Sequence, residues 1–206
     1  MMNWILATVC YDSLKPGYVE SLAETLSGPF APPKGHYKLV NYIYLTFARP
    51  FLIEMVKSEF IGEDLDGVLW IDSDMAWSQS DLGYILAQTE RLPGKILGGF
   101  YMTRKSPLKV VGRPLAFCDD PDVNDPIFSN ELIRADYLGL GFTWTPWSCF
   151  DEDRKPWFGE DGMGEDVFFC RRQREKFKVP IYGLTALDVG HAYEPGVRRI
   201  SDLRKR

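Results

Sequence analysis

Short apolar runs alternate with helical periodicities along the first hundred residues. Three mainly apolar runs have the length of buried strands: residues 3–9, 67–72 and 95–103. Between them, three segments repeat apolar positions every three or four residues, as amphipathic helices do: residues 15–28, 45–60 and 78–92. Strands that alternate with helices in this way are typical of a sheet with helices on its faces. We therefore predict an α/β fold with a mainly parallel sheet.

Two of the predicted helices have clear boundary signals. In residues 15–28, Gly28 stands at a C-cap position. In residues 78–92, Ser78 and Asp81 have the spacing of a capping box. The faces expected to be buried are Tyr18, Leu22 and Leu26 in the first helix and Leu82, Ile85 and Leu86 in the second.

The segment 45–60 contains a proline, Pro50. Proline removes a backbone donor and is tolerated only near the first turn of a helix, so Arg49 is expected close to the helix start. The side expected to be buried consists of Phe51, Leu52, Met55 and Val56.

The second half of the chain has a different pattern. Residues 130–147 predict two short strands on either side of a corner. This corner contains Gly139 and Gly141. Residues 164–177 predict a helix with acidic residues in its first turn and basic residues later, as the helix macrodipole favours. Residues 179–191 predict a final strand that ends at His191.

Length and composition restrict the function classes. The chain has 206 residues, of which 45% are hydrophobic and 26% charged, which is ordinary for one soluble domain. A net charge of −5 argues against a surface that coats polyanions in general. The run MMNWILATVCY lacks the features of a signal peptide, and no segment approaches the roughly 18 apolar residues of a membrane span. The cysteines form no Cys-x-x-Cys pair, so we expect reduced, buried thiols in a cytoplasmic protein.

The strand at 67–72 ends in two acidic residues. The sequence GVLWIDSDMAW places Asp72 and Asp74 directly after a buried run, with Ser73 between them. In open α/β sheets, ligands bind beyond the carboxyl ends of the strands. Mg²⁺ takes carboxylate oxygens and leaves positions for phosphates, and Mn²⁺ also accepts imidazole. Asp-x-Asp by itself is also common in solvated turns and helix caps.

Three further features are candidates for the same site. His191 stands where a strand is expected to end, although a surface or core imidazole has the same pattern. Glu165 and Asp166 stand at the start of a predicted helix, where a carboxylate can act as a general base, although simple N-terminal helix charge explains them too. For Arg49, near a helix start, a surface salt bridge is the alternative.

Taken in order, several segments resemble the GT-A glycosyltransferases: LATVCYD, ARPFLIE, WIDSDM, GGFY, YLGLGF, GEDVFFCRR and VGHAY. The resemblance spans residues 3–195 and is closest to small family-2-like members of bacteria and phages. It implies a single GT-A (Rossmann-like) domain with helices on both faces of its sheet. The nucleotide-binding half would cover residues 1–104 and the acceptor-binding, catalytic half residues 105–195, followed by a basic tail at 196–206.

The resemblance implies roles for the candidate residues. Asp74 matches a direct metal ligand, and Asp72 matches the carboxylate nearer the ribose, which is also counted among the metal-binding residues. His191 matches the late histidine that completes the metal site in many members. Asp166 matches the base that deprotonates the acceptor hydroxyl in inverting enzymes, with Glu165 beside it. The expected metal is Mn²⁺ or Mg²⁺.

Nucleotide-binding residues are implied in the same way. Thr8, Tyr11 and Asp12 match the segment that holds the base. Arg49 matches a helix-borne arginine near the nucleotide pocket, and Ser73 belongs to the same pocket.

The sequence departs from the family pattern at one position and is ambiguous at another. Pro50 follows Arg49 where the family usually has Asn, so the hydrogen bonds of that Asn are absent. The run FGEDGMGED contains a second acidic pair, Glu160 and Asp161, which spacing alone does not exclude. We prefer Glu165 and Asp166 because they directly precede VFFCRR, as in the family pattern.

These features and the resemblance together predict a metal-dependent glycosyltransferase, a hexosyltransferase that moves a sugar from a nucleotide-diphosphate sugar to an acceptor hydroxyl. Inversion with Asp166 as the base is the expected outcome, and retention is the alternative left open, because retaining and inverting enzymes share this fold. A UDP-sugar is the favoured donor, and the acceptor is left open among a glycan, a protein, a small molecule and a modified nucleic acid. One alternative is another metal-dependent nucleotide enzyme, such as a nucleotidyltransferase or a sugar-nucleotide hydrolase. The other is a non-catalytic sugar-nucleotide-binding domain.

The C-terminal run GVRRISDLRKR is strongly basic. It is expected to be a solvated tail. One alternative is a lid whose Arg198 or Arg199 closes over the diphosphate once the donor binds. Another is a contact for a polyanionic acceptor such as DNA.

Overall fold

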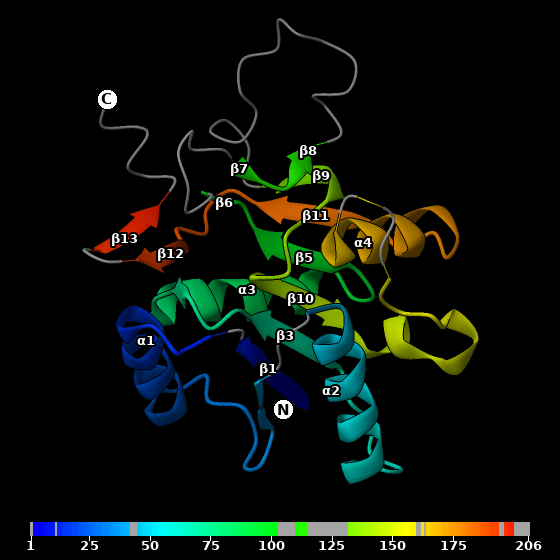
Figure 1. Ribbon diagram of the computed structural model, residues 1–206, viewed down its shortest axis with the longest axis horizontal. Coiled ribbons are helices and arrows are strands. Elements are labelled where there is room, and N and C mark those ends of the chain that lie inside the picture. Colours follow the sequence, from blue (N-terminus) through cyan, green and yellow to red (C-terminus); the bar gives the residue numbers. More distant parts are fainter. Residues whose placement is uncertain are drawn as a thin grey trace, which may run out of the picture.

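The computed structural model describes residues 2–10, 12–41, 45–102, 110–114, 132–159, 162, 164–193 and 196–199. Its centre is an eight-stranded sheet (Figure 1). From one edge to the other, the strands are β2 (Tyr37–Asn41), β1 (Trp4–Cys10), β3 (Gly67–Ile71), β10 (Phe142–Pro146), β5 (Ile96–Gly99), β11 (Ile181–Leu184), β9 (Leu132–Tyr137) and β8 (Arg113–Pro114).

Strand direction in this sheet is mixed. β1 pairs in parallel with β2 and β3, and β11 pairs in parallel with β5. β10 is antiparallel to β3 and β5, and β9 is antiparallel to β11 and β8. Six of the eight described strands therefore share one direction, but four of their seven pairings are antiparallel. The sheet is therefore mainly parallel in strand direction, as predicted, and its antiparallel pairings come from β10, inserted between β3 and β5, and from β9.

Helices cover both faces of the sheet, as predicted (Figure 1). α1 (Pro16–Ser27) and α3 (Gln79–Arg91) lie on one face, and α2 (Leu45–Glu59) and α4 (Glu165–Glu175) lie on the other. Side chains of β1 alternate between the two: Trp4 and Leu6 pack toward α1 and α3, whereas Ile5 packs toward α2. Burial of both faces explains why this strand reads as a continuous apolar run.

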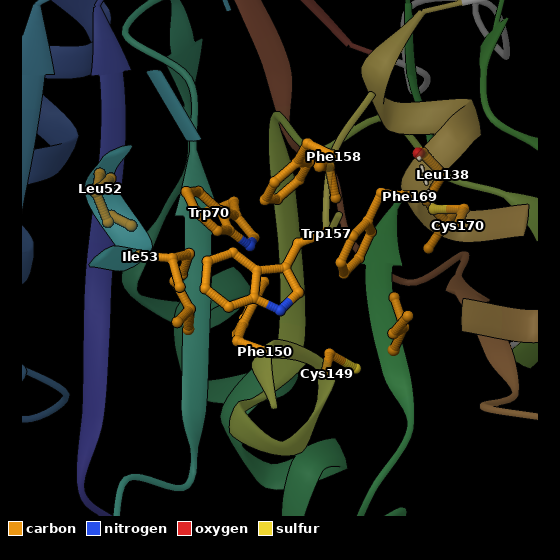
Figure 2. Packing of buried hydrophobic residues seen from close by; sticks show 14 of the residues in the cluster. Leu52, Ile53, Trp70, Leu138, Cys149, Phe150, Trp157, Phe158, Phe169 and Cys170 are labelled. Atoms are coloured by element: carbon orange, nitrogen blue, oxygen red, sulfur yellow. Dashed lines mark hydrogen bonds between the residues drawn. The ribbon is translucent and has the colours of Figure 1, made fainter. Parts of the chain in front are cut away.

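An aromatic cluster beneath α2 and α4 joins the two halves of the chain (Figure 2). Trp70 of β3 meets Phe150 and Phe158 edge-on, with ring centroids 6.1 and 5.9 Å apart. Phe169 of α4 stacks on Phe158 with the ring centroids 4.9 Å apart. Because such cores pack as densely as organic crystals, the cluster holds α4 in place relative to β3.

Two smaller sheets and two short helices complete the described structure. β4 (Met75–Ala76), β12 (Gly190–Tyr193) and β13 (Gly196–Arg199) form an antiparallel sheet, and β6 (Tyr101–Met102) pairs with β7 (Val110–Val111). The 3₁₀ helices η3 (Trp147–Phe150) and η4 (Glu152–Arg154) follow β10. The three-stranded sheet brings the last described residues back to the turn that follows β3.

Strand boundaries in the last part of the chain differ from the prediction. The single strand predicted at 179–191 is wrong, because the chain leaves the large sheet after Leu184 and pairs with β4 only from Gly190 onward. Residues 196–199 of the predicted tail form β13, and residues 200–206 lie outside the described part of the chain. β2 is a further strand that was not predicted.

The predicted face of α1 is partly wrong. Tyr18 is buried as predicted, but Leu26 is 47% exposed and Thr25 is buried in its place. The hydroxyl of Thr25 accepts the indole N–H of Trp77 at 2.9 Å, and that of Ser21 donates to the Trp77 carbonyl at 2.7 Å. The helix therefore buries a polar face, which a count of apolar positions does not detect.

The predicted face of α2 is also partly wrong. Leu52 and Val56 are buried, but Phe51 is 55% exposed. Arg49 is itself buried and shifts the buried face away from Phe51. Pro50 lies in the second turn of the helix rather than the first.

Other local predictions are confirmed. Ser78 Oγ accepts the backbone N–H of Asp81 at 3.2 Å, and the Asp81 carboxylate accepts the backbone N–H of Ser78 at 2.9 Å, which completes the capping box of α3. The described cysteines are buried free thiols: Cys10, Cys149 and Cys170. Cys118 lies outside the described residues. None of the described helices has both the length and the apolar character required to cross a membrane.

Candidate functional site

The acidic turn after β3 is held by backbone hydrogen bonds. The N–H of Asp72 donates to the carbonyl of Gly141 at 3.1 Å, and the N–H of Met75 donates to the carbonyl of Asp72 at 3.0 Å. The carbonyl of Ser73 accepts the N–H of Lys15 at 3.0 Å. The turn is therefore anchored both to the start of α1 and to the glycine corner before β10.

Arg49 lies under this turn. Its Nη2 is 2.8 Å from Asp72 Oδ1 and its Nε is 3.3 Å from Glu165 Oε1. The centre of the guanidinium lies 5.1 Å from the centroid of the Trp70 ring, which places the cation over an aromatic face. Burial opposes the charge of Arg49, but Asp72, Asp166 and Glu165 outweigh it and raise the pKa of the guanidinium. Arg49 is thus a permanent buried cation that ties the end of β3 to the start of α4.

Asp166 is the third carboxylate of this cluster. Its Oδ2 accepts the backbone N–H of Leu140 at 3.1 Å. Part of the residue is exposed, but its Oδ1 is buried and has no hydrogen-bond partner among the described residues. Burial is the main cause that raises the pKa of Asp166 to about 7, with Glu165 and Asp72 adding to it and Arg49 opposing it. A carboxyl group with a pKa near neutrality can serve as a general base.

Asp74 and His191 also meet beside this turn. Because β12 pairs with β4, His191 lies opposite Met75, and its Nε2 is 4.0 Å from Asp74 Oδ1. Each side chain is only 10% exposed. The structure therefore brings together two predicted metal ligands that are far apart in the sequence.

The side chains at the turn fit the expected cation in part. A carboxylate beside an imidazole suits Mn²⁺, and the remaining positions of such a cation are commonly filled by phosphate oxygens and water. Within the described part of the chain, however, no three His, Cys, Asp or Glu side chains are grouped so that they could hold a metal ion. Asp72, predicted as a further ligand, accepts a hydrogen bond from Arg49 Nη2 at its Oδ1. Among the predicted ligands, Asp74 and His191 are therefore the two that lie close enough together to hold the cation.

The predicted nucleotide-binding residues lie in different environments. Thr8 is fully buried, and its hydroxyl is 2.5 Å from that of Tyr18. The side chain of Asp12 is 76% exposed and lies 3.4 Å from Lys15 Nζ. Ser73 is buried in the turn, and Tyr11 lies outside the described residues. Thr8 has its hydrogen-bond partner inside the protein, so Asp12 is the more accessible of the two for a ligand.

Tyr101 belongs to the site but was not predicted. Its Oη accepts the N–H of Gly141 at 3.0 Å, and its ring lies 5.0 Å from the imidazole of His191. The signal was present in the GGFY segment, but a tyrosine within an apolar run reads as a core residue.

Two open hollows, of about 380 and 370 Å³, lie at the opposite end of the sheet. Both are lined by Met2 and Glu90, at the amino end of β1 and on α3. Neither is lined by a residue of the acidic cluster. The cluster around Arg49 is therefore the better candidate site, because it combines buried charges with a carboxyl group of raised pKa.

Comparison with known proteins gives a fold but no family. No protein-family model and no curated protein matches the sequence. Among solved structures, the crystal structure of A197 from STIV is similar, with a TM-score of 0.67 and 18% sequence identity. The similarity covers 93% of this chain and 86% of that chain. At this identity it shows the α/β fold alone.

Proposed function

We propose that the protein is a metal-dependent glycosyltransferase of the GT-A type that moves a sugar, in particular a hexose, from a nucleotide-diphosphate sugar to an acceptor hydroxyl. The observation that carries the proposal is the arrangement around the turn after β3. Asp74 and His191 meet beside it, and Asp72, Glu165 and Asp166 surround Arg49.

The side with Asp74 and His191 suits the diphosphate. Bound Mn²⁺ or Mg²⁺ would offset the negative charge that develops on the leaving nucleotide diphosphate. Asp74, in the turn after β3, and His191, on β12, would hold the cation from two separate segments of the chain. Oδ1 of Asp72 is hydrogen-bonded to Arg49, and the Asp72 side chain is 25% exposed. Its Oδ2 can therefore accept a hydrogen bond from a hydroxyl of the nucleotide sugar.

The side with Asp166 suits the acceptor. The N–H of Leu140 holds Oδ2 of Asp166 and so fixes the partly exposed carboxylate that would take the proton of an incoming hydroxyl. A pKa of about 7 means that a large fraction of Asp166 is ionised at neutral pH and still basic enough to accept that proton. A base on the face opposite the leaving group gives inversion at the anomeric carbon.

A donor panel tests this function. Nucleotide release is measured from UDP-, GDP- and dTDP-sugars with Mn²⁺, with Mg²⁺ and with EDTA, in the presence of glycan, peptide, small-molecule and nucleic-acid acceptors. We expect release that needs a divalent cation, with a UDP-sugar preferred. Turnover that persists in EDTA contradicts the metal dependence.

The same panel separates the alternatives. Release of free sugar without any acceptor product would indicate a sugar-nucleotide hydrolase. Formation of a nucleoside triphosphate and a sugar 1-phosphate when pyrophosphate is added would indicate a nucleotidyltransferase. Nucleotide binding without turnover of any donor would indicate a non-catalytic binding domain.

A further inference from the structure

Tyr101 contacts both sides of the proposed site. It is the first residue of β6 and is 3% exposed. Its Oη accepts the N–H of Gly141 at 3.0 Å. Its ring meets the imidazole of His191 edge-on, with the centroids 5.0 Å apart and the ring planes at 84°. One buried side chain therefore touches a predicted metal ligand and the corner that leads into β10.

This corner holds two of the candidate carboxylate residues. The carbonyl of Gly141 accepts the N–H of Asp72 at 3.1 Å, and the N–H of Leu140 donates to Oδ2 of Asp166 at 3.1 Å. The Oη of Tyr101 is bonded to the same short segment. A displacement of Leu140 and Gly141 would therefore move the backbone of Asp72 and the carboxylate of Asp166 together.

The glycine in this corner leaves the space that the phenol uses. A Cβ on Gly141 would lie 2.7 Å from Tyr101 Oη and 3.2 Å from Asp72 Oδ2, closer than side chains pack. Burial raises the pKa of Tyr101 well above its usual value, and Asp72 and Asp166 add to the effect, so the phenol stays neutral. A neutral, enclosed phenol gives the corner a constant hydrogen-bond partner.

We propose that Tyr101 is a positioning residue, which fixes His191, one of the two residues that would hold the cation, relative to the base Asp166. The inference rests on the proposed function, because it assigns Tyr101 a role in that reaction. The hydroxyl anchors the corner beside Asp166, and the ring orients His191. These two contacts are separable: Tyr101→Phe removes only the first, and Tyr101→Leu removes both.

The experiment compares these variants with a matched control, Tyr18→Phe. Tyr18 is also fully buried, and its hydroxyl is bonded to those of Thr8 and Tyr37, away from the acidic cluster. For each protein, we would measure kcat, KM, the pH profile of kcat and the thermal midpoint. Mn²⁺ affinity is measured separately by calorimetry without substrates, so that one readout does not depend on turnover.

We expect Tyr101→Phe to lower kcat about 10-fold while KM for the donor and Mn²⁺ affinity change little, because only the corner loosens. The pH profile of kcat should also shift, because Asp166 loses its firm contact with Leu140. Tyr101→Leu should in addition weaken Mn²⁺ binding about 10-fold, the range seen when a group that orients a metal ligand is lost. Tyr18→Phe should lower the thermal midpoint and leave kcat unchanged.

A second variant approaches the same corner from the backbone. In Gly141→Ala, the added Cβ should clash with Tyr101 Oη and lower kcat even though Tyr101 is intact. If both Tyr101 variants keep the kcat, pH profile and Mn²⁺ affinity of an active wild type, and lose only as much stability as Tyr18→Phe, Tyr101 is a packing residue and the inference is wrong. A wild type that neither binds Mn²⁺ nor releases any nucleotide rejects the proposed function, and this inference with it.

Discussion

Arg49 of α2 and Asp72 at the end of β3 form a buried ion pair, with Nη2 2.8 Å from Oδ1. The arginine side chain is 1% exposed, whereas the aspartate side chain is 25% exposed, so the cation lies inside and the carboxylate faces outward. The Nη1 of Arg49 has no hydrogen-bond partner among the described residues. Arg49 therefore supports the acidic cluster from below, and this arrangement determines the expected effect of its removal.

Arg49→Ala should destabilise the protein by up to about 3 kcal/mol, because it leaves the carboxylates of Asp72 and Glu165, whose side chains are 25% and 12% exposed, without their buried cation. The measurement is urea unfolding at pH 7. Lys38→Ala is the control, because Lys38 pairs with a more exposed carboxylate, that of Glu59, and should cost at most about 1 kcal/mol. Equal unfolding midpoints for the two variants would contradict the structural role assigned to Arg49.

The stability of the wild type should depend on the protonation of Asp166. Its pKa is about 7 in the folded protein against 3.8 for the free side chain, so between these values the folded state binds the proton more tightly. Stability from this group is therefore fully present below pH 4 and is lost as pH rises through 7, by on the order of 2 kcal/mol for this partly exposed residue. Asp166→Asn should remove this loss. Parallel stability curves for wild type and Asp166→Asn from pH 4 to 8 would rule out the raised pKa.

The rate of transfer should depend on pH in the opposite sense. If Asp166 is the base, kcat should rise with pH around 7 and level off once the carboxyl group is ionised. Asp166→Asn should keep donor binding and lower transfer by roughly 10²–10⁴-fold. Asp161→Asn, in the alternative acidic pair outside the described residues, is the matched control and should be close to wild type. The reverse result would place the base at Asp161.

The two aspartates of the turn should differ in metal binding. Asp74→Asn should weaken Mn²⁺ binding by at least about 10-fold, because it replaces a carboxylate that faces His191. Asp72→Asn should leave Mn²⁺ affinity nearly unchanged, because Asp72 is bonded to Arg49. Calorimetry with Mn²⁺ alone measures both, with circular dichroism as the check on folding. Equal losses of Mn²⁺ affinity in the two variants would indicate that Asp72 is also a metal ligand.

Features of the fold that depend on neighbours in sequence were predictable. The Ser78–Asp81 capping box involves groups three residues apart, and the helix that starts at Glu165 has its acids and bases where the macrodipole favours them. The corner at Gly139 and Gly141 separates β9 from β10 as predicted. In each case the interaction is local, so the pattern of residue types was sufficient.

Features that depend on distant partners were not predictable. Periodicity marked Leu26 as buried, but Thr25 is buried because Trp77, from a different part of the chain, supplies a hydrogen bond. The apolar run at 179–191 predicts one strand, because apolar residues look the same whether they belong to the large sheet or to the three-stranded sheet. The break between β11 and β12 was therefore not predicted. The burial of Arg49 depends on carboxylates 23 and 116 residues away.

The sequence by itself determined the candidate residues: two aspartates at a strand end, an acidic pair at a helix start, a late histidine and an arginine on a helix. Only the tertiary structure decided how they are grouped. The pairing of β4 with β12 brings Asp74 next to His191, and Asp72 forms an ion pair with Arg49. The reason is physical: strand ends and helix starts are set by local propensity, whereas a buried charge takes whichever partner the packing of remote elements brings within reach.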